Sequence, residues 1–148
     1  MWRRKPAVAG SFYPSDPRKL SREIEKHLAA AGEKPLQGKL ISLVAPHAGY
    51  VYSGPVAAFS YKHLIGSGVE VAVVLAPSHR ARFRGASVIP SGIYETPLGD
   101  VPIDETIGAR LVEKPHLGFI KEAHEAEHSL EFRCLFFRWC FRSLAWCL

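Results

Sequence analysis

The spacing of apolar and polar residues predicts that the chain opens with an amphipathic helix. Within residues 15–32, SDPRKLSREIEKHLAAAG, apolar side chains recur at every fourth position and form one stripe: Leu20, Ile24 and Leu28. Asp16 is suited to cap the start of this helix, with Pro17 at the first helical position. Gly32 is suited to end it. We therefore expect one face of this helix to be buried.

Two continuous apolar runs further along predict a pair of buried strands. Residues 39–45, KLISLVA, and residues 69–76, VEVAVVLA, each end directly before a proline. Residues 54–68 lie between them and predict a helix that ends at a glycine. Strand, helix and strand of these lengths form a βαβ unit with parallel strands and a right-handed crossover. A short strand and a turn are expected over 85–99, and a helix over 103–114.

A histidine follows each of the two apolar runs. His47 lies in APHAGYVYSG, residues 45–54, and His79 lies in APSHR, residues 76–80. The carboxyl ends of parallel strands meet at one sheet edge, where α/β proteins bind ligands. Neighbouring strand ends lie about 5 Å apart, or about 10 Å with one strand between them. The two imidazoles can therefore converge on one ion or small substrate, although a locally hydrogen-bonded loop histidine is the alternative for each.

Residues 124–131, HEAEHSLE, hold the remaining candidate groups. His124 and His128 share one face if the segment is helical, and Glu127 and Glu131 share another. Zinc and iron sites normally take three protein ligands, so two histidines alone are too few. The apolar context is weak for the H-E-x-x-H helix of metalloproteases, and a solvated helix start is the alternative.

Composition excludes several classes of protein. The chain has 148 residues, enough for one domain with a core, and 47% of them are hydrophobic. Of the net charge of +5, three charges lie in residues 132–148, which leaves +2 for the rest of the chain. The only local basic cluster is Arg80, Arg82 and Arg84 in a predicted loop, so we expect no nucleic-acid partner. We expect neither a membrane span nor a signal peptide, and hence a cytoplasmic location. The sequence leaves the oligomeric state open.

Several motifs together resemble one known family. They are VAGSFYP (8–14), APHAGYVYSG (45–54), APSH (76–79), YETPLGDVPID (94–104) and EAEHSLE (125–131). In order and spacing they resemble the Memo family, whose prokaryotic members are also called AmmeMemoRadiSam system protein B. The resemblance covers residues 1–131 nearly without gaps.

The resemblance implies a fold and a site. The fold is α/β, with a parallel-containing sheet flanked by helices, similar to class III extradiol dioxygenases of the LigB type, of which this chain would be the amino-terminal half. His47 and His79 correspond to metal ligands, and a cysteine from the missing half would be the third. The metal implied by analogy with the dioxygenases is iron. Copper is the alternative, because a soft cysteine ligand favours it. Four further residues are expected near the metal pocket: Tyr50, Tyr52, Ser78 and His128.

The resemblance leaves the activity open, because dioxygenase chemistry follows here from fold analogy alone. A metal-dependent oxidoreductase is one interpretation. The alternatives are a non-catalytic module that binds a small molecule or peptide in the cleft, and an inactive fragment of a longer protein.

The last 17 residues, FRCLFFRWCFRSLAWCL, depart from the family pattern V-Q-x-P-F-L. They hold six of the 16 aromatic residues, all three cysteines and no acidic residue. An odd cysteine number without a signal peptide argues against a disulfide framework. With one choice of synonymous codons, a base added after codon 131 changes the reading to E-V-Q-V-P-F-L-Q-V-V-L-Q. We therefore interpret residues 1–131 as the amino-terminal half of the domain and 132–148 as an out-of-frame tail.

Overall fold

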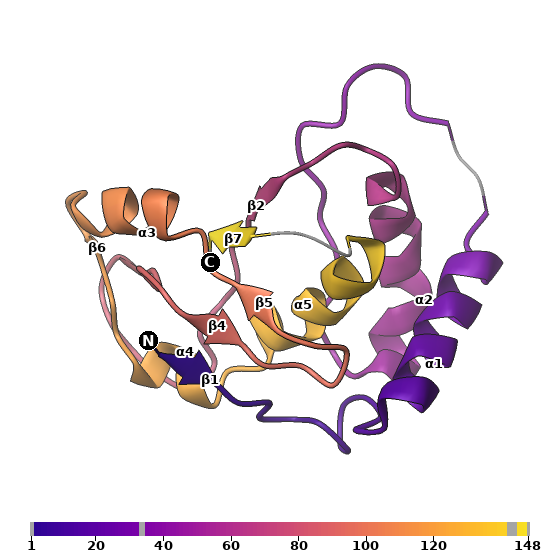
Figure 1. Cartoon of the computed structure of the whole chain (residues 1–148), viewed down its shortest axis with the longest axis horizontal. Coiled ribbons are helices and arrows are strands. Elements are labelled where there is room, and N and C mark those ends of the chain that lie inside the picture. The colour runs from indigo at the N-terminus through magenta and orange to yellow at the C-terminus, as the bar shows by residue number, and fades with distance from the viewer. Residues whose placement is uncertain (1, 33–34, 142–144, 148) are drawn as a thin grey trace.

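The computed structural model describes residues 2–32, 35–141 and 145–147. Three helices pack together on one side of the molecule, and short strands with two further helices lie on the other (Figure 1). The three packed helices are α1 (Pro17–Ala30), α2 (Tyr50–Tyr61) and α5 (Ser129–Cys140). The other helical elements are η1 (Lys62–Leu64), α3 (Glu105–Val112) and α4 (Glu122–Glu125).

The strands are short and form three small sheets. They are β1 (Arg3–Arg4), β2 (Val71–Val73), β3 (Ala86–Ser87), β4 (Ile93–Tyr94), β5 (Val101–Pro102), β6 (Leu117–Gly118) and β7 (Ala145–Cys147). Strand β4 pairs parallel with β1 and antiparallel with β5, while β2 pairs parallel with β7 and β3 with β6. The fold is therefore mixed α/β, with parallel strands flanked by helices, as the sequence predicted.

Local sequence signals place α1 correctly. The Asp16 carboxylate accepts a hydrogen bond from the backbone N–H of Lys19 at 2.8 Å and caps the helix, as expected. The predicted apolar stripe is buried: Leu20, Ile24 and Leu28. The same device starts α3, where the Asp104 carboxylate accepts from the N–H of Ile107 at 2.9 Å. The start of each helix is thus determined by a capping residue within its own segment.

Helix α2 begins four residues earlier than the sequence predicted and ends at Tyr61. The backbone N–H of Tyr50 donates to the carbonyl of Phe12 at 2.8 Å, which docks the start of α2 on the amino-terminal segment. Gly49 permits this close approach, because a Cβ there would lie 3.3 Å from the Phe12 carbonyl oxygen. The start of α2 is therefore set by a contact between distant segments.

The strand predicted over residues 39–45 does not form, and β2 covers only part of the second predicted strand. Apolar side chains in both segments face solvent: Ile41 is 84% exposed, Val44 91% and Leu75 83%. A strand needs a neighbour to satisfy its backbone groups. No described segment pairs with residues 39–45, so this run stays without regular structure.

Helix α5 runs through the core and includes residues 132–140 of the segment that we interpret as an out-of-frame tail. Phe132, Leu135 and Phe136 are fully buried. The ring of Phe136 stacks on Tyr61 of α2, with centroids 4.8 Å apart. Among the described residues, no helix is both long and apolar enough to cross a membrane.

A buried ion pair joins the two ends of this fold. The guanidinium of Arg4 in β1 binds the carboxylate of Glu131 in α5, and both side chains are 1% exposed. Glu131 also accepts hydrogen bonds from the backbone N–H groups of Ala7 and Val8, at 2.8 Å and 3.1 Å, and from the hydroxyl of Tyr13. One carboxylate thus holds the amino-terminal segment against α5.

We predict that Arg4→Met strongly destabilises the protein, because it leaves the Glu131 carboxylate buried without its cation. Breaking such a pair costs about 3–5 kcal/mol in the free energy of unfolding, measured by urea denaturation. Arg3→Met is the matched control, since its ion pairs with Glu95 and Asp100 are at the surface. Equal losses in the two variants would contradict the assigned role of Arg4.

Candidate metal centre

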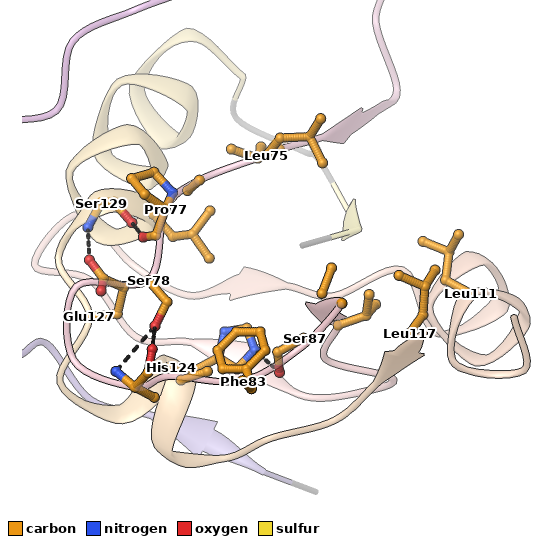
Figure 2. A pocket seen from close by; sticks show the side chains of 18 of the residues that line it. Leu75, Pro77, Ser78, Phe83, Ser87, Leu111, Leu117, His124, Glu127 and Ser129 are labelled. Atoms are coloured by element: carbon orange, nitrogen blue, oxygen red, sulfur yellow. Dashed lines mark hydrogen bonds between the residues drawn. The ribbon is translucent and has the colours of Figure 1, made fainter. Parts of the chain in front are cut away.

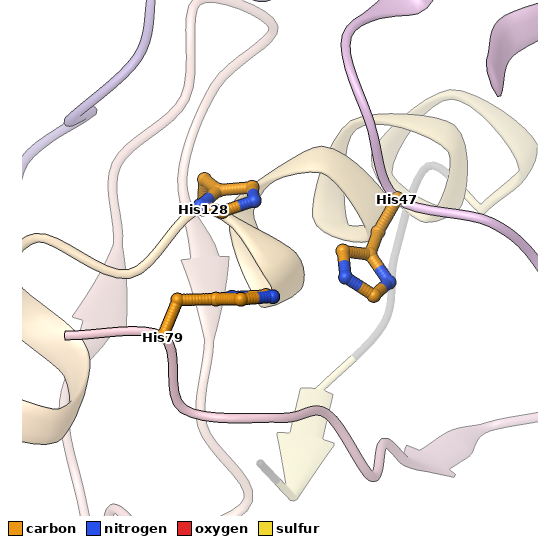
Figure 3. Close-up of side chains that lie close together, drawn as sticks. All are labelled: His47, His79 and His128. Carbon is orange, nitrogen blue, oxygen red and sulfur yellow. The ribbon is translucent and has the colours of Figure 1, made fainter. Parts of the chain in front are cut away.

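Three histidine side chains from distant parts of the chain meet at one place. The ligand nitrogens of His47, His79 and His128 all lie within 4.8 Å of one another. The rings of His79 and His128 stack with their centroids 4.5 Å apart, and the ring centroids of His47 and His79 are 5.4 Å apart (Figure 3). A cluster of imidazoles with this spacing can hold a metal ion.

Each of these histidines lies where a segment of the backbone ends or begins. His47 follows the apolar run 39–45, and His79 follows the run that contains β2. His128 is the residue directly before α5. The structure thus brings His47 and His79 together, although no strand forms over residues 39–45, and it places His128, which was expected near the pocket, beside them as a third candidate ligand.

Arg133 of α5 fixes the two segments that lead to the first two histidines. Its guanidinium donates to the carbonyls of Leu75 at 2.6 Å and Ala45 at 3.0 Å. The side chain Nε of Arg133 is buried without a hydrogen-bond partner. The same guanidinium thus orders both backbone segments and places a positive charge near His47.

Phe12 covers the cluster from the amino-terminal side. Its ring packs edge-on against His128, with centroids 4.9 Å apart. Its carbonyl accepts the N–H of Tyr50, the first residue of α2, directly after Gly49. The amino-terminal motif VAGSFYP therefore contributes to this site through packing.

The electrostatic surroundings favour neutral imidazoles. Burial, followed by the positive charge of Arg133, lowers the pKa of His47. Burial also lowers the pKa of His128, against an opposing effect of Glu127. Since metal ions bind the neutral imidazole, both residues are in the form that a ligand requires near neutral pH.

Glu127, which the sequence placed among the candidate groups of residues 124–131 without a role, lies at this site. Its buried carboxylate accepts hydrogen bonds from Nδ1 of His79 at 2.8 Å and from the backbone N–H of the same residue at 2.6 Å. It also accepts from the N–H groups of His128 and Ser129, both at 2.9 Å. Burial alone would raise the pKa of Glu127, but the hydrogen bonds from His79 and Ser129 outweigh it and lower the pKa to about 2. Glu127 is therefore ionised at neutral pH.

The other predicted pocket residues lie in different surroundings. Tyr50 is fully buried, and its ring packs against Phe132 and Phe136 in the core. Tyr52 is 81% exposed on the surface of α2. The hydroxyl of Ser78 donates to the carbonyl of Ala81 at 2.9 Å. A role for these three residues in the pocket stays a prediction.

His124 does not belong to the cluster. Helix α4 ends at Glu125 and α5 begins at Ser129, so His124 and His128 do not share the face of one helix. This break excludes an H-E-x-x-H metal helix. The buried ring of His124 instead hydrogen-bonds through Nε2 to the Ser87 hydroxyl at 2.8 Å.

The cysteine side chains that the structure describes are protonated and therefore poor metal ligands. Burial raises the pKa of both Cys134 and Cys140 to about 12, so both remain protonated thiols. Thiolate is the form that binds metals, so neither is a favourable ligand in this state.

A cavity of about 600 Å³ lies beside the cluster. Its wall is mostly apolar, with Leu111 and Leu117 on one side and Ser78 and Glu127 on the other (Figure 2). Because Ser78 adjoins His79 and Glu127 binds it, the cavity and the histidine cluster share a wall.

Comparison with known proteins identifies the family. The profile of the family described as Memo-like protein matches residues 4–144. The chain belongs to the Memo family. A MEMO1 family protein of Saccharolobus islandicus is 42% identical over 150 residues, which cover 94% of this chain and 53% of the relative. A MEMO1 family protein of Methanothermobacter thermautotrophicus is 42% identical over 136 residues, covering 86% of this chain and 49% of the relative. This Memo-family chain thus spans about half the length of the relatives it matches.

We predict that His124 makes the Memo-family chain less stable in acid. Burial, followed by the charge of Arg4, lowers the pKa of His124 to about 4, against an opposing effect of Glu127. The unfolded chain therefore binds this proton first, and the free energy of unfolding falls as the pH drops from 6.5 to about 4. The loss is about 3 kcal/mol over this window.

Urea denaturation at a series of pH values measures this effect. His124→Gln keeps a polar side chain beside Ser87 but removes the titration, so its stability should vary less between pH 6.5 and 4. Identical pH profiles for the two proteins would show that another group is responsible.

Proposed function

We propose that this Memo-family chain binds a transition-metal ion through His47, His79 and His128. The observation that carries the proposal is the convergence of three imidazoles within 4.8 Å. The lowered pKa values of His47 and His128 support it, since both rings are neutral near pH 7.

The spacing of the nitrogens fits an ion after a small adjustment. Metal–nitrogen bonds of about 2.1 Å place two tetrahedral ligands roughly 3.4 Å apart. The imidazoles therefore need to approach one another by up to about 1.4 Å, which rotation of the His47 and His128 side chains can supply. Three protein ligands leave a coordination position open for a substrate.

Iron and copper are the ions that we propose. Imidazole binds both, and a cysteine ligand from a further segment, as family resemblance implies, would favour copper. Either metal supplies one-electron and dioxygen chemistry when bound. The reaction class that we propose is accordingly an oxidoreductase related by fold to class III extradiol dioxygenases of the LigB type.

The adjacent cavity supports a small molecule as the substrate. Its volume of about 600 Å³ lies within the usual range for small-molecule sites, and its wall is mostly apolar with a few polar groups. The same cavity supports the second candidate function, a module that binds a small molecule or peptide without converting it. Metal binding at the cluster distinguishes the first function from the second.

We predict that each of His47→Ala, His79→Ala and His128→Ala weakens metal binding at least tenfold, because each removes one of three ligands. The measurement is calorimetric titration of chelator-treated protein with Fe(II) under anaerobic conditions, repeated with Cu(I) by chelator competition. His63→Ala, outside the cluster in η1, is the control and should bind as the unmodified chain does.

Unchanged affinity in the three cluster variants would overturn the proposed metal site. In that case binding of small molecules in the cavity, without metal, becomes the better account.

We also propose that residues 132–148 are translated out of frame. We further propose that the exposed apolar side chains in residues 39–45 and 71–76 pack against further chain in an intact family member. The buried, unpaired Nε of Arg133 supports the first statement, because the shifted frame places glutamine at this position. The exposure of Ile41, Val44 and Leu75 supports the second. The coverage of only 53% of a relative's length is consistent with the second.

We predict that a new nucleotide read across codon 131 contains one additional base. The restored frame should then begin E-V-Q-V-P-F-L and remain open well beyond codon 148. A read that reproduces the present frame would contradict the proposal and make residues 132–148 the true sequence.

A further inference from the structure

We infer that Glu127 is a positioning residue that sets the tautomer of His79 and directs its Nε2 toward the metal. This inference rests on the proposed metal site, which it deepens by naming the group that prepares one ligand. Glu127 itself is not among the three candidate ligands.

The contacts of Glu127 leave His79 little freedom. The carboxylate holds both the ring and the backbone of this residue, at 2.8 Å and 2.6 Å respectively. Two separate anchor points restrict rotation of the side chain as well as movement of the loop. The carboxylate is only 2% exposed, so water competes weakly for either contact.

The chemistry of the pair determines where the proton of a neutral imidazole lies. Three backbone N–H groups already donate to the Glu127 carboxylate, which makes it the acceptor, so Nδ1 of His79 is the donor in its contact with Oε1. The neutral ring then carries its lone pair on Nε2. Figure 3 shows the ring of His79 directed into the space between His47 and His128. The nitrogen without a proton is thus the one available to an ion.

The same carboxylate also fixes a second candidate ligand. Its Oε1 accepts the backbone N–H groups of His128 and Ser129 at the start of α5. These N–H groups lack partners within the helix, and the positive end of the helix dipole stabilises the negative charge of Glu127. One buried group therefore sets the separation between the loop of His79 and the helix that follows His128.

A carboxylate that accepts a hydrogen bond from a metal-binding histidine commonly raises metal affinity 10- to 100-fold. We expect Glu127→Gln to lower affinity by that factor. The amide keeps the size of the side chain, but it loses the charge and places an N–H₂ group against one of the donors of His79 or His128.

The first measurement is made on the metal-free chain. Long-range ¹H–¹⁵N spectra of histidine rings distinguish the Nδ1–H tautomer from the Nε2–H tautomer, with the His79 signal assigned by its loss in His79→Ala. The unmodified chain should show His79 with its proton on Nδ1. Glu127→Gln should show a mixture or the opposite tautomer, together with the loss of Fe(II) affinity.

Two matched variants separate positioning from general structural effects. Glu125→Gln removes a nearby exposed carboxylate, which pairs with Lys121. Glu131→Gln removes a buried carboxylate one helical turn away, whose hydrogen bonds go to the amino-terminal segment. Both should retain the tautomer of His79, although the second should lower the unfolding temperature.

The outcomes distinguish the inference from the proposed function. If His79 of the unmodified chain carries its proton on Nε2, the inference is overturned, whether or not Glu127→Gln folds. An unchanged tautomer in folded Glu127→Gln also overturns it. If the tautomer changes but the unmodified chain binds neither Fe(II) nor Cu(I), the positioning role is supported and the proposed metal function fails.

Discussion

The pair of Arg4 and Glu131 connects the beginning of this chain to the last helix that the structure describes in full. A buried ion pair is costly to desolvate, and it persists only when its remaining lone pairs are satisfied. Glu131 meets this condition, because Tyr13 and two backbone N–H groups bind the same carboxylate. Since α5 begins only two residues earlier, this pair also determines where His128 lies relative to the amino-terminal segment.

Helix α5 organises the candidate metal centre from within the core. Glu127 precedes it and holds the loop of His79, while Arg133 binds the carbonyls at the ends of the two apolar runs. Arg133 has opposing effects. Its hydrogen bonds order the segments that carry His47 and His79, but after burial its charge is the next cause of the lowered pKa of His47, and it would repel a bound cation. A glutamine at this position would retain the hydrogen-bonding capacity without the charge.

The histidine cluster is well packed, whereas several apolar side chains of the segments that lead to it are exposed. The histidines converge although residues 39–45 have no strand partner, because loops and α5 hold them. The side chains of Ile41, Val44 and Leu75 nevertheless remain exposed to water, so they do not contribute the stabilisation that burial of apolar surface provides. The geometry of the candidate ligands is thus less dependent on the sheet than the strand-end argument assumed.

Sequence by itself determined what depends on neighbouring residues and on shared motifs. The cap at Asp16 and the stripe from Leu20 to Leu28 specify α1 locally, and the motifs around His47 and His79 were sufficient to identify the Memo family. Tertiary structure decided the rest. The lack of a strand at 39–45, the separation of His124 from His128 and the binding of His79 by Glu127 all depend on segments tens of residues apart. No local pattern encodes such contacts, because a buried carboxylate acquires its partners only when packing excludes water from around it.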